Sequence, residues 1–69
     1  MNDDVFKGQW KQLRGEVRKQ WNQLTDDDLD VVGGELDKLE GRLQERYGWE
    51  KERAKMEIDT WRRTHLSRI

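Results

Sequence analysis

Few side chains in this sequence are placed to do acid–base or nucleophilic chemistry. The single histidine, His65, lies near the C-terminus among Arg62, Arg63 and Arg68, where we expect it to be solvated rather than catalytic. Ser67 is too close to the end to be an organised nucleophile. The chain has no cysteine, which excludes a thiol nucleophile, a disulfide scaffold and a Cys-ligated zinc site. Carboxylates are abundant, but an active site needs perturbed groups in a concave pocket, and 69 residues leave little room for one. We therefore predict no catalytic activity, no cofactor and no small-molecule substrate.

The densest group of carboxylates is the run Asp26-Asp27-Asp28, followed by Asp30. It resembles a calcium loop only in its charge, because the alternating oxygen ligands, the glycine at position six and the terminal glutamate of an EF-hand are absent. Thr25 precedes the run and can cap a helix, whose positive end favours acids in its first turn. The pattern thus predicts the start of a helix and no metal site.

Nucleic-acid binding is an alternative raised by the charge distribution. Residues 25–40 hold seven acids and one base, a net charge of −6, whereas residues 41–69 hold eight bases and five acids, a net charge of +3. Arginines of this second half could contact phosphates while a tryptophan stacks on a base. The overall charge of −1 lacks the usual basic footprint, and Arg and Glu alternate as in solvent-facing helical pairs. The candidate contacts of this alternative are Arg53, Trp61, Arg62 and Arg63.

The elements that would position these residues are all helical. Apolar residues recur in steps of three and four from residue 6 to residue 24, which predicts one amphipathic helix with a single apolar stripe. The stripe resumes after Thr25 from residue 29 to residue 47, but Gly33-Gly34 interrupts it. We predict a short helix near 26–32 and a longer one near 35–47, with one continuous kinked helix as the alternative.

The C-terminal part predicts one more helix. Gly48 follows Tyr47 as a left-handed C-cap, and the last helix then runs from about residue 49 to residue 65. Residues 66–69 are expected to fray. The predicted core of all these helices is Phe6, Trp10, Leu13, Val17, Trp21, Leu29, Val32, Leu36, Leu39, Leu43, Tyr47, Ala54, Ile58 and Trp61.

An internal repeat appears when the sequence is shifted by 26 residues. Both copies read Gly-x-apolar-x-x-Leu-x-Gly-x-apolar-x-x-x-aromatic, and Gly8 falls on Gly34 and Gly15 on Gly41. The repeat indicates two equivalent helical hairpins related by pseudo-two-fold symmetry. Two amphipathic helices would share a stripe by chance, but they would not share two glycines.

These glycines lie opposite the apolar stripe on a helical wheel, at 100° per residue. Three explanations stay open. Gly8 and Gly34 could lie at helix starts, where glycine costs nothing; a marginal fold could tolerate the loss; or another helix or another chain could approach the bare backbone. On the last helix Trp49 and Met56 lie away from the stripe and would mark a partner site if exposed, although Trp49 could instead pack at a hairpin junction. The candidate interaction surface is Gly8, Gly15, Gly34, Gly41, Trp49 and Met56.

Composition decides whether such a chain folds. Charged residues make up 42 % of the sequence and apolar residues 32 %, which raises the alternative of a mostly disordered protective chain. The periodic stripe and four tryptophans favour a single folded domain over residues 1–69. No run approaches the roughly 20 apolar residues of a membrane span, so we expect no membrane-spanning helix. The acidic start Met1-Asn2-Asp3-Asp4 is unlike a secretory signal, so we expect no such signal.

The motifs now on the page resemble a known family. Gly8-x-Trp10-Lys11-Gln12-Leu13-x-Gly15, Gln20-Trp21-x-x-Leu24-Thr25-Asp26-Asp27-Asp28, Gly33-Gly34, Leu39-x-Gly41, Gln44-Glu45-Arg46-Tyr47-Gly48 and Trp61 together resemble the CsbD-like family of small bacterial stress-response proteins. The resemblance covers almost the whole chain. It implies an all-α, small four-helix domain of two hairpins packed crosswise, similar to SAM-like folds, and cytoplasmic expression raised under stress. It implies no activity and supplies no catalytic residues.

Two function classes follow. The first is a stress-induced interaction or protective protein without catalysis, with an unknown protein partner or weak self-association. The second is a nucleic-acid-associated accessory protein that uses the basic C-terminal half. Arginines interleaved with glutamates would favour the first, and a single basic face with an exposed tryptophan would favour the second.

Overall fold

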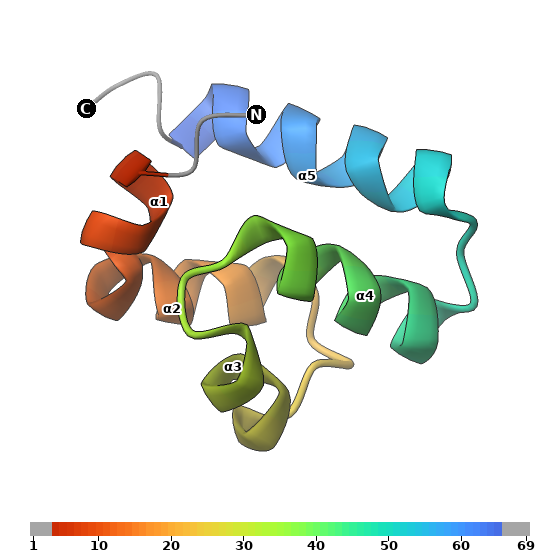
Figure 1. The fold of residues 1–69 in the computed structure, drawn as a ribbon, viewed down its shortest axis with the longest axis horizontal. Coiled ribbons are helices and arrows are strands. Elements are labelled where there is room, and N and C mark those ends of the chain that lie inside the picture. Colours follow the sequence, from red (N-terminus) through yellow and green to blue (C-terminus); the bar gives the residue numbers. More distant parts are fainter. Residues whose placement is uncertain (1–3, 66–69) are drawn as a thin grey trace.

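The computed structural model describes residues 4–65, and the described part is helical (Figure 1). Its helices are α1 (Asp4–Gly8), α2 (Trp10–Gln20), α3 (Asp26–Val32), α4 (Leu36–Tyr47) and α5 (Lys51–His65). The predicted all-α class is confirmed, but these are five helices where four were predicted. The predicted fraying of residues 66–69 falls outside the described residues.

The first predicted helix is wrong in its extent. The chain breaks it at Gln9, whose backbone (φ −112°, ψ 16°) has left the helical region, and α2 then starts at Trp10. Helix α2 ends at Gln20, so Trp21 and Leu24 lie in the following loop, where the Leu24 N–H donates to the Trp21 carbonyl at 3.1 Å. Both side chains are nevertheless buried, which is why the apolar spacing continues past the end of the helix.

The glycine pair ends α3 as predicted. Gly33 caps the helix in the left-handed region at φ 51°, and Gly34 follows at φ 90°. Two consecutive positive φ angles cannot belong to one continuous helix, so the kinked-helix alternative is wrong. Gly48 (φ 68°) ends α4 in the same way, as predicted.

The two long helices begin at equivalent positions of the repeat. Trp10 starts α2 and Leu36 starts α4, 26 residues apart, and Gly15 and Gly41 are each the sixth residue of their helix. The repeat therefore corresponds to a real recurrence of a long helix after a short one.

One hydrophobic core lies between the helices. Helix α4 packs against both α3 and α5, and α1 reaches the C-terminal end of α5 through an edge-on contact between Phe6 and Trp61, with ring centroids 6.1 Å apart (Figure 1). The predicted core is confirmed except at Trp10 and Tyr47, which pack against it partly buried. Leu24, absent from the predicted core, is 1 % exposed.

Candidate interaction surfaces

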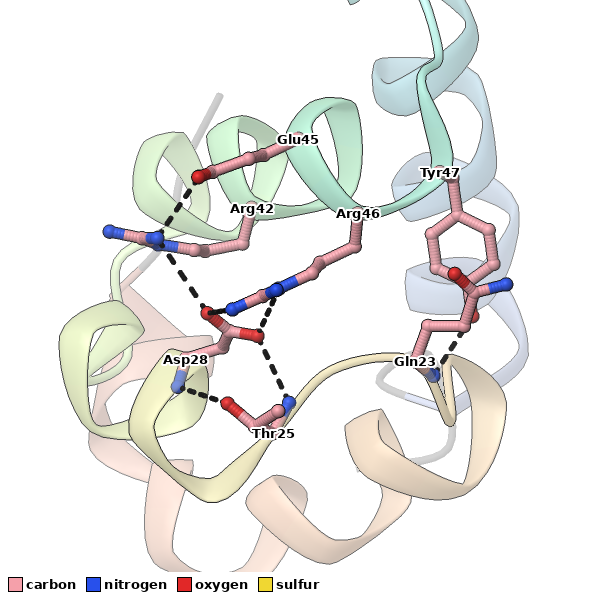
Figure 2. Close-up of polar contacts among 7 residues, drawn as sticks. All are labelled: Gln23, Thr25, Asp28, Arg42, Glu45, Arg46 and Tyr47. Atoms are coloured by element: carbon pink, nitrogen blue, oxygen red, sulfur yellow. Dashed lines mark hydrogen bonds and ion pairs between the residues drawn. The ribbon is translucent and has the colours of Figure 1, made fainter.

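The best-connected polar group is the carboxylate of Asp28, which is buried where α3 meets α4 (Figure 2). Thr25 and Asp28 form a capping box: the Asp28 N–H donates to Thr25 Oγ1 at 3.1 Å, and the Thr25 N–H donates to Asp28 Oδ2 at 3.0 Å. Arg46 of α4 donates two hydrogen bonds to the same carboxylate, at 2.8 and 3.1 Å. Arg42 Nη1 approaches it at 3.6 Å. These hydrogen bonds and ion pairs link the first turn of α3 to the last turns of α4.

The environment of Asp28 favours its charged form. The hydrogen bonds from Arg46, together with those with Thr25, outweigh the opposing effect of burial and lower the pKa of this carboxyl to about 2. The predicted capping role of Thr25 is confirmed. The pairing with Arg46 was not predicted, because an 18-residue separation leaves no periodic signal. The contacts of this carboxylate thus cap α3 through Thr25 and join α3 to α4 through Arg46 and Arg42.

A second cluster, here called the aromatic corner, consists of Tyr47, Trp49 and Arg53. The rings of Tyr47 and Trp49 stack at 4.6 Å between centroids, and the Arg53 guanidinium lies 5.0 Å from the centre of the Trp49 ring. The Tyr47 hydroxyl accepts a hydrogen bond from the Gln23 N–H at 3.3 Å (Figure 2). Trp49 is half-buried at the junction between α4 and α5, and Met56, one of its predicted neighbours on the surface, is 61 % exposed.

The four repeat glycines divide into two kinds. Gly8, Gly15 and Gly41 are exposed, and a Cβ added at any of them would meet nothing within 4 Å. Gly34 is buried, and a Cβ there would lie 3.1 Å from the Lys7 Cα and 3.2 Å from the Trp10 Cβ. Of the three explanations left open by the sequence, the approach of another helix to the bare backbone therefore applies to Gly34, because the junction of α1 and α2 packs against it. Its place on the candidate interaction surface is wrong, since Gly34 is buried.

An open depression lies beside Gly41, between α3 and α4. It has a volume of about 280 Å³ and is lined by Val31, Lys38, Gly41, Arg42 and Glu45. Four of these, Lys38, Gly41, Arg42 and Glu45, are here called the α4 face, because they lie opposite the buried leucines of the same helix.

The predicted nucleic-acid contacts are not assembled into one surface. Trp61 is 3 % exposed, with its ring packed among Phe6, Trp21 and His65, so the expectation that it stacks on a base is wrong. The apolar periodicity also predicted Trp61 as a core residue, and this prediction is confirmed. His65 is also not simply solvated: its ring stacks on Trp61 at 4.8 Å, and its Nδ1 lies 3.0 Å from the Trp61 carbonyl oxygen.

The arginines of α5 lie among acids. Arg53 pairs with Glu57 at 3.1 Å and Arg63 with Asp59 at 2.9 Å, each one helical turn apart, while Arg62 is half-buried. Over residues 4–65 no three His, Asp or Glu side chains are grouped so that they could hold a metal ion. None of the described helices is long and apolar enough to cross a membrane.

The helical fold and these polar surfaces define a small all-α domain. The CsbD-like family model matches residues 4–56, which is well over half of the chain. The protein belongs to the CsbD-like family. The matched stretch ends inside α5, so Trp61 lies beyond it.

Several bacterial proteins are similar over most of their length. The UPF0337 protein YjbJ of Escherichia coli O6:H1 is 48 % identical over 65 residues, covering 94 % of each chain. The UPF0337 protein PA4738 of Pseudomonas aeruginosa is 57 % identical over 58 residues, covering 84 % of this chain and 89 % of its own. The UPF0337 protein ECA0631 of Pectobacterium atrosepticum is 52 % identical over 65 residues, covering 94 % of each chain.

Proposed function

We propose that this protein acts without catalysis, as a bacterial stress-response factor that works through contacts with other proteins. The observation that carries the proposal is the pairing of charges over its surface. Arg42 with Glu45, Arg53 with Glu57 and Arg63 with Asp59 join cations to anions one turn apart, so in the described part of the chain these three arginines do not form a uniformly basic face that could follow a phosphate backbone. The stress role and the cytoplasmic location rest on the family resemblance.

The chemistry of the described side chains supports the same proposal. Asp28 carries the largest pKa change, and its neighbours are an arginine and a helix cap rather than a substrate pocket. The apolar area offered to a partner lies instead in exposed residues such as Met56 and Val31, 61 % and 45 % exposed. Methionine side chains adapt to irregular partner surfaces, which suits a protein that protects several clients.

Two measurements test this proposal. A heat-labile enzyme is warmed with and without the chain while light scattering is recorded, and we expect the chain to delay aggregation. A proton–nitrogen correlation spectrum is then recorded with a mixed DNA and RNA oligonucleotide at low salt, and we expect no change at Arg53, Arg62 or Arg63. Undiminished scattering would overturn the proposal. Oligonucleotide shifts at these arginines that vanish in salt would also overturn it and would favour the nucleic-acid alternative.

The repeat supports a proposal about architecture as well. We propose that the two copies form hairpins packed crosswise around a pseudo-two-fold axis, as in SAM-like domains. The equal starting positions of α2 and α4 support it. An experimental structure in which the copy at 10–20 superposes on that at 36–46 together with their flanking helices would bear it out, and one in which only the single helices superpose would refute it.

A further inference from the structure

Among the described residues, nothing in the surroundings of Gly41 requires a glycine at that position. It is the sixth of the twelve residues of α4, its backbone is helical, and the space beyond it is open to 4 Å. Glycine in the interior of a helix destabilises it relative to alanine. Gly33, Gly34 and Gly48 differ, because their positive φ angles favour glycine.

The surface around Gly41 combines bare backbone with apolar and charged walls. Val31 of α3, 45 % exposed, lines one side of the depression, and Lys38, Arg42 and Glu45 surround the glycine on α4. Because glycine has no side chain, a second helix can approach the backbone of α4 closely at this point. The side chains of that second helix would then cover the exposed valine and remove its apolar surface from water.

Two charges of the α4 face, those of Lys38 and Glu45, complement each other when the order of residues is reversed. Lys38 and Glu45 are seven residues apart, about 10 Å along the helix, and the midpoint between them falls between Gly41 and Arg42. When a second copy of α4 crosses antiparallel at this midpoint, Lys38 of each copy faces Glu45 of the other. The same operation lays Arg42 of each copy over Gly41 of the other, where the missing side chain leaves room for it. A parallel crossing would instead oppose like charges.

We propose that the α4 face binds a second copy of this chain, antiparallel, with Gly41 at the crossing point. This proposal rests on the proposed function, that the protein acts through contacts with proteins, and names a second copy of the chain as one such partner. Arg42 Nη1 also approaches the buried Asp28 carboxylate, but at 3.6 Å, which is longer than the two hydrogen bonds that Arg46 donates to it. The exposed pairs do not block the crossing: Lys38 with Glu35 (2.8 Å) and Arg42 with Glu45 (3.0 Å) involve side chains that are 30 to 62 % exposed. Such exposed pairs contribute little and exchange partners readily.

The first copy of the repeat provides an internal control. On α2 the positions equivalent to Lys38, Gly41, Arg42 and Glu45 are Gln12, Gly15, Glu16 and Lys19. The same antiparallel crossing at Gly15 would place Gln12 opposite Lys19 and form no ion pair. Gly15 also faces open space, so it tests the glycine alone, without the complementary charges.

The experiment compares full-length variants by sedimentation velocity and by NMR from micromolar to millimolar concentration. The wild type is expected to show concentration-dependent amide shifts between Lys38 and Glu45. Gly41→Leu should weaken self-association about tenfold or more, a change of about 1.4 kcal/mol, whereas Gly15→Leu should leave it unchanged. Lys38→Glu should weaken it similarly, and Lys38→Glu combined with Glu45→Lys should restore it.

A wild type that stays monomeric at millimolar concentration, an equal effect of Gly15→Leu, or failure of the double charge swap to restore association would each overturn the proposal. Helical circular dichroism of every variant shows whether the fold is intact. If the wild type is monomeric but still delays client aggregation, the dimer is wrong and the proposed function stands. If the dimer forms but aggregation is undiminished, the proposed function fails and the dimer stands.

Discussion

The carboxylate of Asp28 makes the stability of this protein sensitive to acid. Its pKa in the folded chain is about 2, below the ordinary value of 3.8 that the unfolded chain restores. A lowered folded pKa stabilises the fold fully above the unfolded value, and this contribution is lost as the pH falls toward the folded value. The stabilisation that Asp28 contributes is therefore lost between about pH 4 and pH 2.

The magnitude follows from the size of the shift. One pKa unit corresponds to about 1.36 kcal/mol, so the full contribution is at most roughly 2.5 kcal/mol at neutral pH. Screening lowers this figure, because Arg46 is 41 % exposed while Asp28 is 3 % exposed at its side chain. About 1 kcal/mol of it is lost between pH 7 and pH 3. For a domain of this size a change of about 1 kcal/mol shifts the melting temperature by about 4–8 °C.

The assay is thermal unfolding followed by circular dichroism from pH 7 to pH 2, for the wild type, Asp28→Asn and Asp27→Asn. Asp28→Asn should lower the melting temperature at pH 7, and its curve should converge with that of the wild type near pH 2. Asp27→Asn removes a neighbouring exposed carboxylate of the same helical turn and should run close to the wild type throughout. Wild-type and Asp28→Asn curves that stay parallel down to pH 2 would refute the assignment of the buried ion pair.

Three further substitutions test the packing by urea unfolding. Gly15→Ala and Gly41→Ala should each stabilise the monomer by up to about 1 kcal/mol, because a Cβ there meets open space in a helix interior; destabilisation at either position would show that the helix is packed there. Gly34→Ala should destabilise by about 1–3 kcal/mol, because its φ of 90° is strained for alanine and its Cβ would lie 3.1 Å from the Lys7 Cα; a neutral result would mean that α1 does not pack there. Leu24→Ala should cost about 2–5 kcal/mol, close to the whole stability of so small a domain, and a change under about 1 kcal/mol would place Leu24 outside the core.

The sequence predicted the helices because their signals are local. The Thr25 cap, the glycine pair and Gly48 each act within one turn, and each ends or starts a helix where it was expected. The apolar stripe also identified nearly all of the core. It could not locate the end of α2, since Trp21 and Leu24 keep the helical spacing while their backbone has already turned into a loop.

The spacing of apolar residues could not predict the contacts between different helices. Asp28 looked like one of three equivalent acids at a helix start, but in the structure it closes the capping box with Thr25, and the approach of α4 brings Arg46 to within 2.8 Å of it. Trp61 had two incompatible roles, as part of the core stripe and as a stacking platform among arginines. Burial against Phe6 and Trp21 decides between them, because a ring that is 3 % exposed cannot also cover a base.

The equivalent glycines Gly8 and Gly34 show that a repeat in sequence need not mean a repeat in environment. Gly34 accepts the junction of α1 and α2 against its backbone, so one of the two glycines has its explanation within the chain. Gly8 faces open space, and its place at the last residue of α1 makes its cost small. Gly15 and Gly41 have neither explanation: each lies inside a helix, and a Cβ added there would meet nothing within 4 Å. Of these two, only Gly41 lies between a lysine and a glutamate that would pair with those of an antiparallel copy. Its substitution therefore separates the stability of the monomer, which alanine should raise, from association with a second copy, which leucine should prevent.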